Sequence, residues 1–382
     1  MNRTVLIAAV AAFLLKASLA FLTYGTNDVL FYEGYLKTIK NKGPLAVYEL
    51  GAQLERDGIT YHSEPFWTPP FIINYLLGLD LVSSATGFPM RVWLRLVSSL
   101  ADFVTLFLLL RMHPAGKPVG LLIALAPVSI LVSGFHGSTD SVMLAFLMAS
   151  VYFAARPGGS DISGVLYGLC CAVKVWPAIF LPCFILSFPQ WRVRTRFALL
   201  AAATWSVVSL PYLAQRPLFI VNRILSYQSV DMAWGVRFMA KLLNPNLNQF
   251  VGRYGAVITF AVIAILSVFF AKRQAKLHLQ IAVVSLFFVF FSPGFGYQYL
   301  IWLTPAMPLL FAWELVIWHL VSGYYLIYIY SYFLDANRLA NVLAKSPSLT
   351  LILLAVPVWF FVGYWLIVAS LRVRRRCKAK GP

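Results

Sequence analysis

Acidic residues are scarce in this sequence. Its 382 residues include 13 Asp and Glu against 31 Lys and Arg, which gives a formal net charge of +18. Charged residues of both signs make up only 12% of the chain, about half the share found in soluble domains. This composition excludes an ordinary soluble domain. Because the basic residues lie in short segments between apolar runs and at the C-terminus, the charge indicates membrane topology and no nucleic-acid partner.

Sequence motifs for cofactors are also absent. The four cysteines, Cys170, Cys171, Cys183 and Cys377, provide no disulfide framework. The sequence has no Cys/His metal cluster, phosphate-binding glycine loop, dinucleotide fingerprint or G-x-S-x-G motif. We therefore predict no metal ligands and no required cofactor, with the need for a divalent metal left open. A nucleotide site on the inner face has no support.

Hydrophobic residues make up 60% of the chain, and several apolar runs approach the ~20 residues that cross a bilayer. The sequence predicts an all-α polytopic membrane protein with about 12 transmembrane helices and large extracytoplasmic loops that carry interfacial helices. The predicted spans are residues 5–23, 92–110, 119–134, 140–155, 162–173, 175–188, 197–213, 252–271, 277–292, 299–318, 320–334 and 349–371.

The segment from Phe66 to Leu79 decides the topology. It is apolar but short, and it contains the pair Pro69-Pro70, so we interpret it as an interfacial or re-entrant helix that does not cross. Every basic loop then falls on one side, as the positive-inside rule requires. We expect a multi-pass protein of the plasma (inner) membrane with both termini in the cytoplasm and most acids outside.

The chain reads as one membrane-embedded module. Its expected parts are a catalytic core at 1–213 with an exterior loop at 24–91, a second exterior loop at 214–251, C-terminal helices at 252–371 and a basic cytoplasmic tail at 372–382.

Two acids follow the first predicted span. Asp28 is placed at the membrane surface, where the next residues have the spacing of an amphipathic helix. A carboxylate there could act as general base on a hydroxyl at the membrane boundary. An N-cap made by Asn27 or Asp28 is an equally good interpretation. Glu33, one to two turns further on, reads as a supporting or solvated residue near bound substrate.

Asp140 and Lys174 are the next candidates. Asp140 begins the fourth predicted span on the same outer face as Asp28, and either site chemistry or helix capping explains it, with capping favoured. His136, just before it, is a weaker candidate for substrate contact. Lys174 lies in an apolar run that Pro177 breaks, and such a lysine is a functional candidate. Since no acid lies within one turn of Lys174, we expect a lipid phosphate as its counter-ion, with snorkelling to headgroups as the alternative.

Later segments add phosphate- and sugar-binding candidates. Arg223 and Arg237 lie in the second exterior loop among aromatic residues, and arginine binds phosphate bidentately. Aromatic anchoring at the interface is the alternative for that loop. Tyr297 and Gln298 lie in a polar, aromatic turn, where the amide of Gln298 can donate to and accept from sugar hydroxyls.

The layout resembles the GT-C superfamily of membrane glycosyltransferases. The matching segments are Asn27-Asp28 after the first span, Thr68-Pro69-Pro70-Phe71, His136-Gly137-Ser138-Thr139-Asp140-Ser141, Lys174-Val175-Trp176-Pro177 and Gln298-Tyr299-Leu300-Ile301-Trp302-Leu303-Thr304-Pro305. The last is similar to the bacterial branch that uses polyprenol-phosphate-mannose. Glu64-Pro65-Phe66-Trp67 differs from the acid-Tyr-Pro-Pro pattern of eukaryotic relatives.

The resemblance implies an inverting hexosyltransferase of the cell envelope that acts on the outer face of the membrane. The donor would be a polyprenyl-phosphate sugar, with mannose favoured, and the acceptor a lipid-linked or glycan hydroxyl. Asp28 would be the base, Asp140 a supporting acid, and Lys174 with Arg223 or Arg237 the donor phosphate site. The main alternative is a polytopic transporter or flippase, which would carry acids within its spans. A membrane acyltransferase would need a histidine, for which His136 is the candidate.

Overall fold

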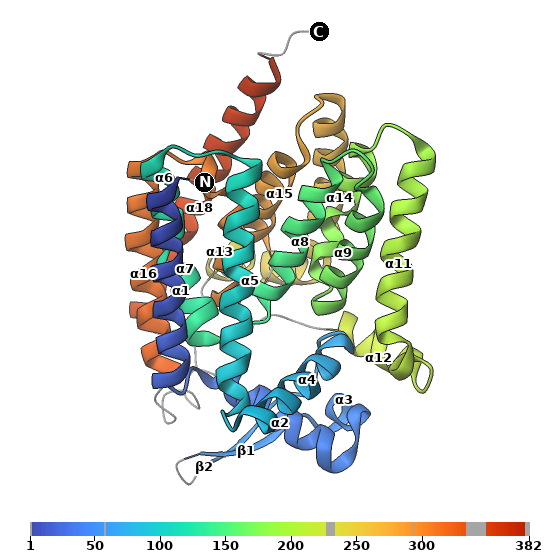
Figure 1. Cartoon of the computed structure of the whole chain (residues 1–382). Coiled ribbons are helices and arrows are strands. Elements are labelled where there is room, and N and C mark those ends of the chain that lie inside the picture. Colours follow the sequence, from blue (N-terminus) through green and yellow to red (C-terminus); the bar gives the residue numbers. More distant parts are fainter. Residues whose placement is uncertain (1, 57–58, 227–233, 293, 334–348, 379–382) are drawn as a thin grey trace.

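The computed structural model describes residues 2–56, 59–226, 234–292, 294–333 and 349–378. Helices dominate this part of the chain and stand side by side in a bundle (Figure 1). Within it, six helical segments are long and apolar enough to cross a membrane: Arg3–Leu22, Met90–Met112, Lys117–His136, Trp191–Leu213, Pro245–Lys272 and Leu349–Arg375. The protein therefore has the character of a multi-pass membrane protein, while the count of twelve spans stays a prediction.

The bundle is built from the helices α1 (Arg3–Leu22), α5 (Met90–Met112), α6 (Lys117–Ala124), α8 (Asp140–Ala154), α9 (Ser160–Val173), α11 (Trp191–Leu213), α14 (Pro245–Lys272), α15 (Leu277–Phe291), α16 (Ala312–Phe333) and α18 (Leu349–Lys378). Short elements interrupt them: α7 (Pro127–Ser129), the π-helix η2 (Ile130–His136), the 3-10 helices η3 (Trp176–Phe180) and η4 (Tyr297–Leu309), α10 (Leu181–Ser187) and α13 (Gly235–Leu243).

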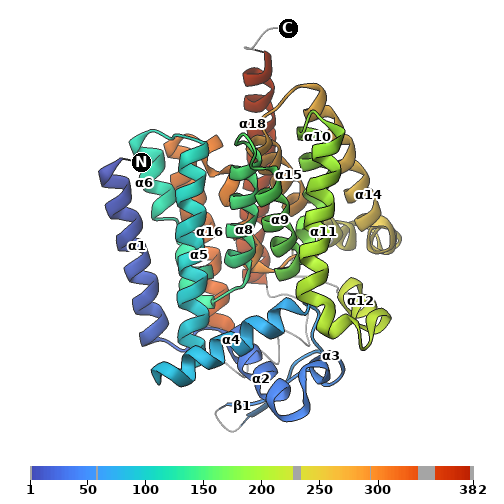
Figure 2. The ribbon, with the colours of Figure 1, turned by 45° about the vertical axis from the view of Figure 1, so that its right-hand side comes forward.

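A layer of short elements covers one end of the bundle. It consists of α2 (Asn27–Lys42), η1 (Pro44–Ala46), α3 (Val47–Leu50), strands β1 (Gln53–Arg56) and β2 (Ile59–His62), α4 (Phe71–Thr86) and α12 (Pro217–Leu225). The start of α1 and the end of α18 lie at the opposite end of the bundle (Figures 1 and 2). The predicted exterior loop 24–91 is thus a structured cap, remote from both termini.

Helix α4 begins directly after Pro70 and runs obliquely across the end of the bundle instead of along it (Figure 2). Proline fits the start of a helix because its missing N–H has no helical partner there. The predicted helix at Phe66–Leu79 is therefore present, shifted to Phe71–Thr86.

Within the described residues the predicted helical class is confirmed, with one short hairpin in which β1 and β2 pair in antiparallel register from Gln53↔His62 to Arg56↔Ile59. The predicted spans 299–318 and 320–334 are wrong, because they divide the chain at the wrong place. Pro305 and Pro308 lie within the 3-10 helix η4, and α16 then runs unbroken from Ala312 to Phe333. Proline removes a backbone donor, which disfavours an α-helix up to this point.

The turn from α1 into α2 is held by the buried Arg95 of α5. Its guanidinium donates to the carbonyl oxygens of Leu19 at 3.1 Å and of Ala20 at 2.5 Å, and to Oγ1 of Thr23 at 2.8 Å. The carbonyl of Leu19 also accepts from the backbone N–H of Thr23 at 3.1 Å. Arg95 adds donors to the last turn of α1, where carbonyls lack the N–H groups of a following turn. Gly25, with φ of 97°, then reverses the chain where a Cβ atom would meet Val29 at 2.8 Å. The first turn of α2, with Asp28, is thereby fixed against the bundle.

Candidate active site

Asp28 and His136 form the first half of a charged cluster at the capped end of the bundle. Oδ2 of Asp28 lies 3.1 Å from Nε2 of the fully buried His136. The other ring nitrogen, Nδ1, lies 2.5 Å from Oγ1 of Thr26. Nδ1 and the threonine hydroxyl thus share a hydrogen bond, while Nε2 faces the carboxylate at ion-pair distance. The Asp28 side chain keeps 27% exposure, so the carboxylate is held in place and still accessible.

The interpretation of Asp28 as a helix cap is wrong. The N-cap of α2 is Thr26, and no side chain caps the helix there. Burial by itself would raise the pKa of Asp28, but the charge and hydrogen bond of His136 and the charge of Lys174 more than offset it and hold that pKa below its ordinary value. Asp28 is therefore an ionised carboxylate at neutral pH, able to accept a hydrogen bond or a proton.

Asp140, Lys174 and Trp302 form the second half of the cluster. The fully buried Asp140 carboxylate accepts from Nζ of Lys174 at 3.0 Å through Oδ2 and from Nε1 of Trp302 at 3.0 Å through Oδ1. Ser138 donates to the same carboxylate at 2.6 Å. The capping interpretation is confirmed for the neighbours of Asp140: α8 begins at Asp140 with Thr139 as its N-cap, and Oγ of Ser138 accepts from the backbone N–H of Asp140 at 3.1 Å. The Asp140 side chain itself makes no cap.

The expectation about the counter-ion of Lys174 also needs correction. Its partner in the structure is the carboxylate of Asp140, which comes from a different helix and 34 positions away in the chain. Buried charges are stable only when they are paired, so a carboxylate from α8 supplies what the neighbours of Lys174 in sequence do not. The predicted break is present: α9 ends at Val173, Lys174 is extended and η3 begins at Trp176.

Tyr32 on α2 connects the two halves. Its hydroxyl lies 3.2 Å from Oγ1 of Thr139, the residue before Asp140. Burial raises the pKa of Tyr32 to about 12; the charges of Lys174, Asp28 and Asp140 also act on this hydroxyl, Lys174 in the opposite direction to the two carboxylates. The phenol therefore stays protonated at neutral pH and can donate a hydrogen bond within the cluster.

Aromatic rings pack around both halves. Trp302 stacks between Trp176 and Tyr299, each with its ring centroid 3.8 Å away. The ring of His136 stacks on Tyr330 of α16 at 5.2 Å and meets the edge of Tyr297 at 5.3 Å. The short helix η4 thus supplies Tyr297 to one half and Trp302 to the other. These stacked and edge-on contacts bury the rings and fix both halves of the cluster in place.

Glu33 is separate from Asp28 and Asp140. It accepts a hydrogen bond from the hydroxyl of Tyr24 and lies 3.6 Å from Nη1 of Arg91, whose guanidinium also covers the Tyr24 ring at 4.7 Å. These contacts hold the segment that leads into α2 against α5, and the Glu33 carboxylate is paired with Arg91.

Arg223 and Arg237 show no contact with the acid cluster among the described residues. The guanidinium of Arg223 lies over the ring of Trp67 at 4.4 Å, and that of Arg237 lies beside Gly252 of α14. Within the described part of the chain, Nε of each arginine and Oε1 of Gln298 are buried and have no hydrogen-bond partner. These atoms retain binding capacity that the described residues do not use.

Four predicted site residues, Asp28, His136, Asp140 and Lys174, meet in one cluster. Sequence reasoning missed Thr26, Tyr32 and Tyr330, and it quoted Trp302 only as part of a motif. A hydroxyl or aromatic residue in an apolar run has the sequence signature of ordinary core packing, so nothing local marks these four.

In the part of the chain that the structure describes, no group of three or more His, Cys, Asp or Glu side chains is placed to hold a metal ion. The chain matches none of the protein-family models and none of the curated proteins to which it was compared. Fold and cluster together define a helical membrane protein with a charged, aromatic-lined cluster at one end of its bundle.

Proposed function

We propose that this protein is an inverting glycosyltransferase that moves a hexose, with mannose favoured, from a polyprenyl-phosphate donor to a hydroxyl of a lipid-linked or glycan acceptor. The observation that carries the proposal is the Asp28 carboxylate, held by His136 and partly exposed at the capped end of a membrane bundle. The short motifs of the GT-C resemblance point to the same chemistry.

In the proposed reaction, Asp28 accepts the proton of the acceptor hydroxyl. The oxygen of that hydroxyl attacks the anomeric carbon of the donor sugar at the same time. The bond from that carbon to the phosphate oxygen breaks on the opposite face, and its electron pair leaves with the polyprenyl phosphate. A phosphate leaving group needs charge stabilisation more than a proton. His136 is a positioning residue in this scheme, since its contacts are to Asp28 and Thr26.

The pairing of Lys174 with Asp140 changes how the donor phosphate would be held. The carboxylate of Asp140 already balances the charge of Lys174. Arg223 and Arg237 would therefore neutralise more of the negative charge of the donor phosphate than Lys174 does. Their unpartnered Nε atoms support this assignment. Glu33, Tyr297 and Gln298 are proposed to line the sugar and acceptor side.

The capped end of the bundle is proposed to face outward from the plasma (inner) membrane, with both termini in the cytoplasm. The basic loops support this orientation through the positive-inside rule. The amphipathic α2 and the oblique α4 suit the membrane interface, where a lipid-linked donor and an acceptor glycolipid would meet.

The proposal is tested by a transfer assay with the full-length protein in membranes. Radiolabelled polyprenyl-phosphate mannose, glucose and galactose are offered with total envelope glycolipids and glycans as acceptors. We expect label in a glycosidic product with inverted anomeric configuration, and none with Asp28→Asn. Failure of all three donors with protein that is shown to be folded would reject the proposal.

A transporter or flippase is the alternative, and the acid within α5 is the observation that bears on it. Asp102 is 5% exposed and pairs with Lys16 of α1, and Ser129 donates to it at 2.6 Å. These contacts fix Asp102 in a structural pair. Uptake of a labelled lipid-linked sugar into sealed vesicles without any product would favour the transporter.

A further inference from the structure

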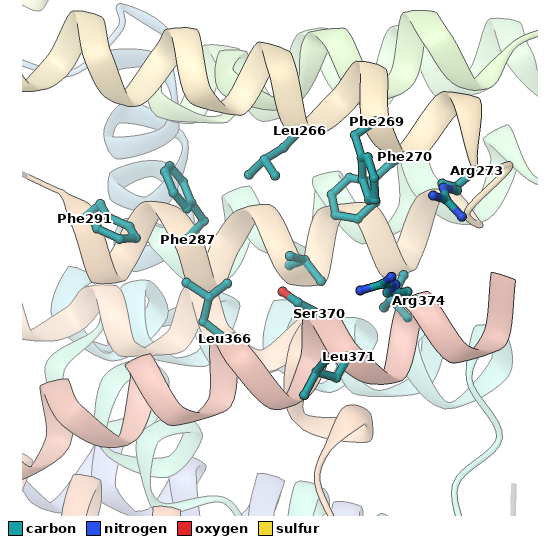
Figure 3. A pocket seen from close by; sticks show the side chains of 12 residues that line it. Leu266, Phe269, Phe270, Arg273, Phe287, Phe291, Leu366, Ser370, Leu371 and Arg374 are labelled. Atoms are coloured by element: carbon teal, nitrogen blue, oxygen red, sulfur yellow. The ribbon is translucent and has the colours of Figure 1, made fainter. Parts of the chain in front are cut away.

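A lateral groove runs between α14, α15 and α18, on elements that do not contribute to the acid cluster (Figure 3). Its volume is about 420 Å³, within the range of about 300–1,000 Å³ that is usual for ligand pockets. Side chains such as Leu266 of α14, Phe287 of α15 and Leu366 of α18 line it. The groove is therefore apolar along most of its length.

One end of the groove is basic. Arg273, just after α14, and Arg374, near the end of α18, lie at this end, and Phe291 lies at the other (Figure 3). Both arginines are exposed. Among the described residues, neither guanidinium pairs with a carboxylate; Arg273 lies over the ring of Phe269 at 5.5 Å. Two cations at the mouth of an apolar channel are complementary to an anionic head on an apolar tail.

The arginines also mark the level of a membrane boundary. The apolar segments Pro245–Lys272 and Leu349–Arg375 both end at this point, and the basic end of the groove lies on the side of the C-terminus of α18 (Figure 1). A headgroup at the arginines would therefore lie at the interface, and its chains would follow the groove into the bilayer core.

We propose that this groove is a binding site for an anionic glycerophospholipid. The lipid phosphate contacts Arg273 and Arg374, and an acyl chain occupies the apolar channel between the three helices. The site lies on the leaflet opposite the acid cluster. It is independent of the proposed transferase reaction, and the bound lipid would act as a structural partner that joins α14, α15 and α18.

The site is tested by native mass spectrometry of the full-length protein exchanged into micelles with phosphatidylglycerol or phosphatidylcholine. We expect wild-type protein to retain phosphatidylglycerol and the double variant Arg273→Gln/Arg374→Gln to retain about thirty-fold less, the effect of two basic groups near a lipid phosphate. The matched double variant Arg253→Gln/Arg375→Gln removes the same charge from exposed positions outside the groove and should bind as wild type.

Location is tested on the wild-type protein with phosphatidylglycerol that carries a diazirine on its acyl chain. Cross-links should map to α14, α15 and α18, and Ser370→Trp, which fills the groove from α18, should reduce them. Equal retention of the two lipids, equal losses in both double variants, or cross-links elsewhere would each overturn the proposal. Preferential retention of a polyprenyl phosphate in a competition would overturn the assignment of the occupant.

Discussion

At the residue scale, Asp28 carries the proposed chemistry. Asp28→Asn keeps the shape of the side chain but removes its ability to accept a proton, so we expect turnover to fall about 100-fold or more with little change in donor binding. Initial rates of sugar transfer at saturating donor measure this effect. The control is Asp80→Asn, which removes an acid on α4 that pairs with Lys40 at the surface. Near-normal turnover in a folded Asp28→Asn protein would contradict the assignment of Asp28 as the general base.

The contact with His136 predicts a pH effect. Burial raises the pKa of Asp28 and His136 lowers it, with the net pKa below the ordinary 3.8. The ionised Asp28 carboxylate therefore contributes stability above pH 3.8, which is lost as the pH falls through the lowered pKa. In His136→Phe only burial and Lys174 remain, so the acid limb of kcat/KM should move to higher pH. The control is His113→Phe, which changes the histidine that follows α5 and should leave the acid limb in place. An unmoved acid limb in His136→Phe would show that His136 does not affect the pKa of Asp28.

The pair of Lys174 and Asp140 predicts a loss of stability. Lys174→Ala leaves a fully buried carboxylate without its cation, which costs about 3 kcal/mol or more, and it should raise the KM for the donor more than that for the acceptor. The double variant Lys174→Met/Asp140→Asn should recover most of the thermal stability while transfer stays low. Thermal unfolding in detergent measures the first effect. No recovery in the double variant would contradict the pairing.

The sequence identified the charged residues of the cluster but not their partners. An acid or a lysine in an apolar segment is conspicuous because its burial is costly, so Asp140 and Lys174 could be selected one at a time. Their pairing depends on the packing of α8 against α9, whose C-cap is Lys174, and no local pattern encodes that packing. Tyr32 was missed because a tyrosine in an amphipathic helix has the same signature whether it packs or donates to a site.

At the element scale, the turn from η2 into α8 sets the spacing of the two halves. Gly137 has φ of 74°, and a Cβ atom there would lie 2.7 Å from Cγ of Arg95. Gly137→Ala should therefore lower stability by more than the left-handed backbone alone costs, about 1–2 kcal/mol, and should also lower transfer. Gly158→Ala is the matched control, since Gly158 has φ of 70° and open space around its Cα. Equal losses would mean that the contact with Arg95 is unimportant.

Prolines in the sequence predicted helix ends correctly. Predictions of secondary structure were wrong where hydropathy was the main signal. Pro70 and Pro177 marked real boundaries. The long apolar stretch after Tyr297 hid a 3-10 segment, because hydropathy does not distinguish helix types. The hairpin lies in the polar part of the predicted exterior loop 24–91, for which we predict no strands, although Asp57-Gly58 is a turn-forming pair; that pair lies outside the described residues.

At the scale of the whole molecule, the cap and the termini lie at opposite ends of the bundle. In a cysteine-free background, Glu64→Cys should react with a membrane-impermeant thiol reagent in intact cells, and Lys117→Cys should react only after permeabilisation. Both side chains are exposed, so access depends on the side of the membrane alone. Labelling of intact cells at position 117 but not at position 64 would show that the capped end faces the cytoplasm and would contradict the proposed orientation.

The buried pair of Lys16 and Asp102 has a consequence for biosynthesis. The lysine enters the bilayer with α1, but its carboxylate follows 86 residues later on α5. A lone lysine near the middle of a span raises the free energy of insertion by about 2.5–3.5 kcal/mol, which the apolar remainder of α1 must offset. Helix α1 is therefore expected to remain beside the insertion machinery until α5 emerges, so the order of synthesis becomes part of how this bundle assembles.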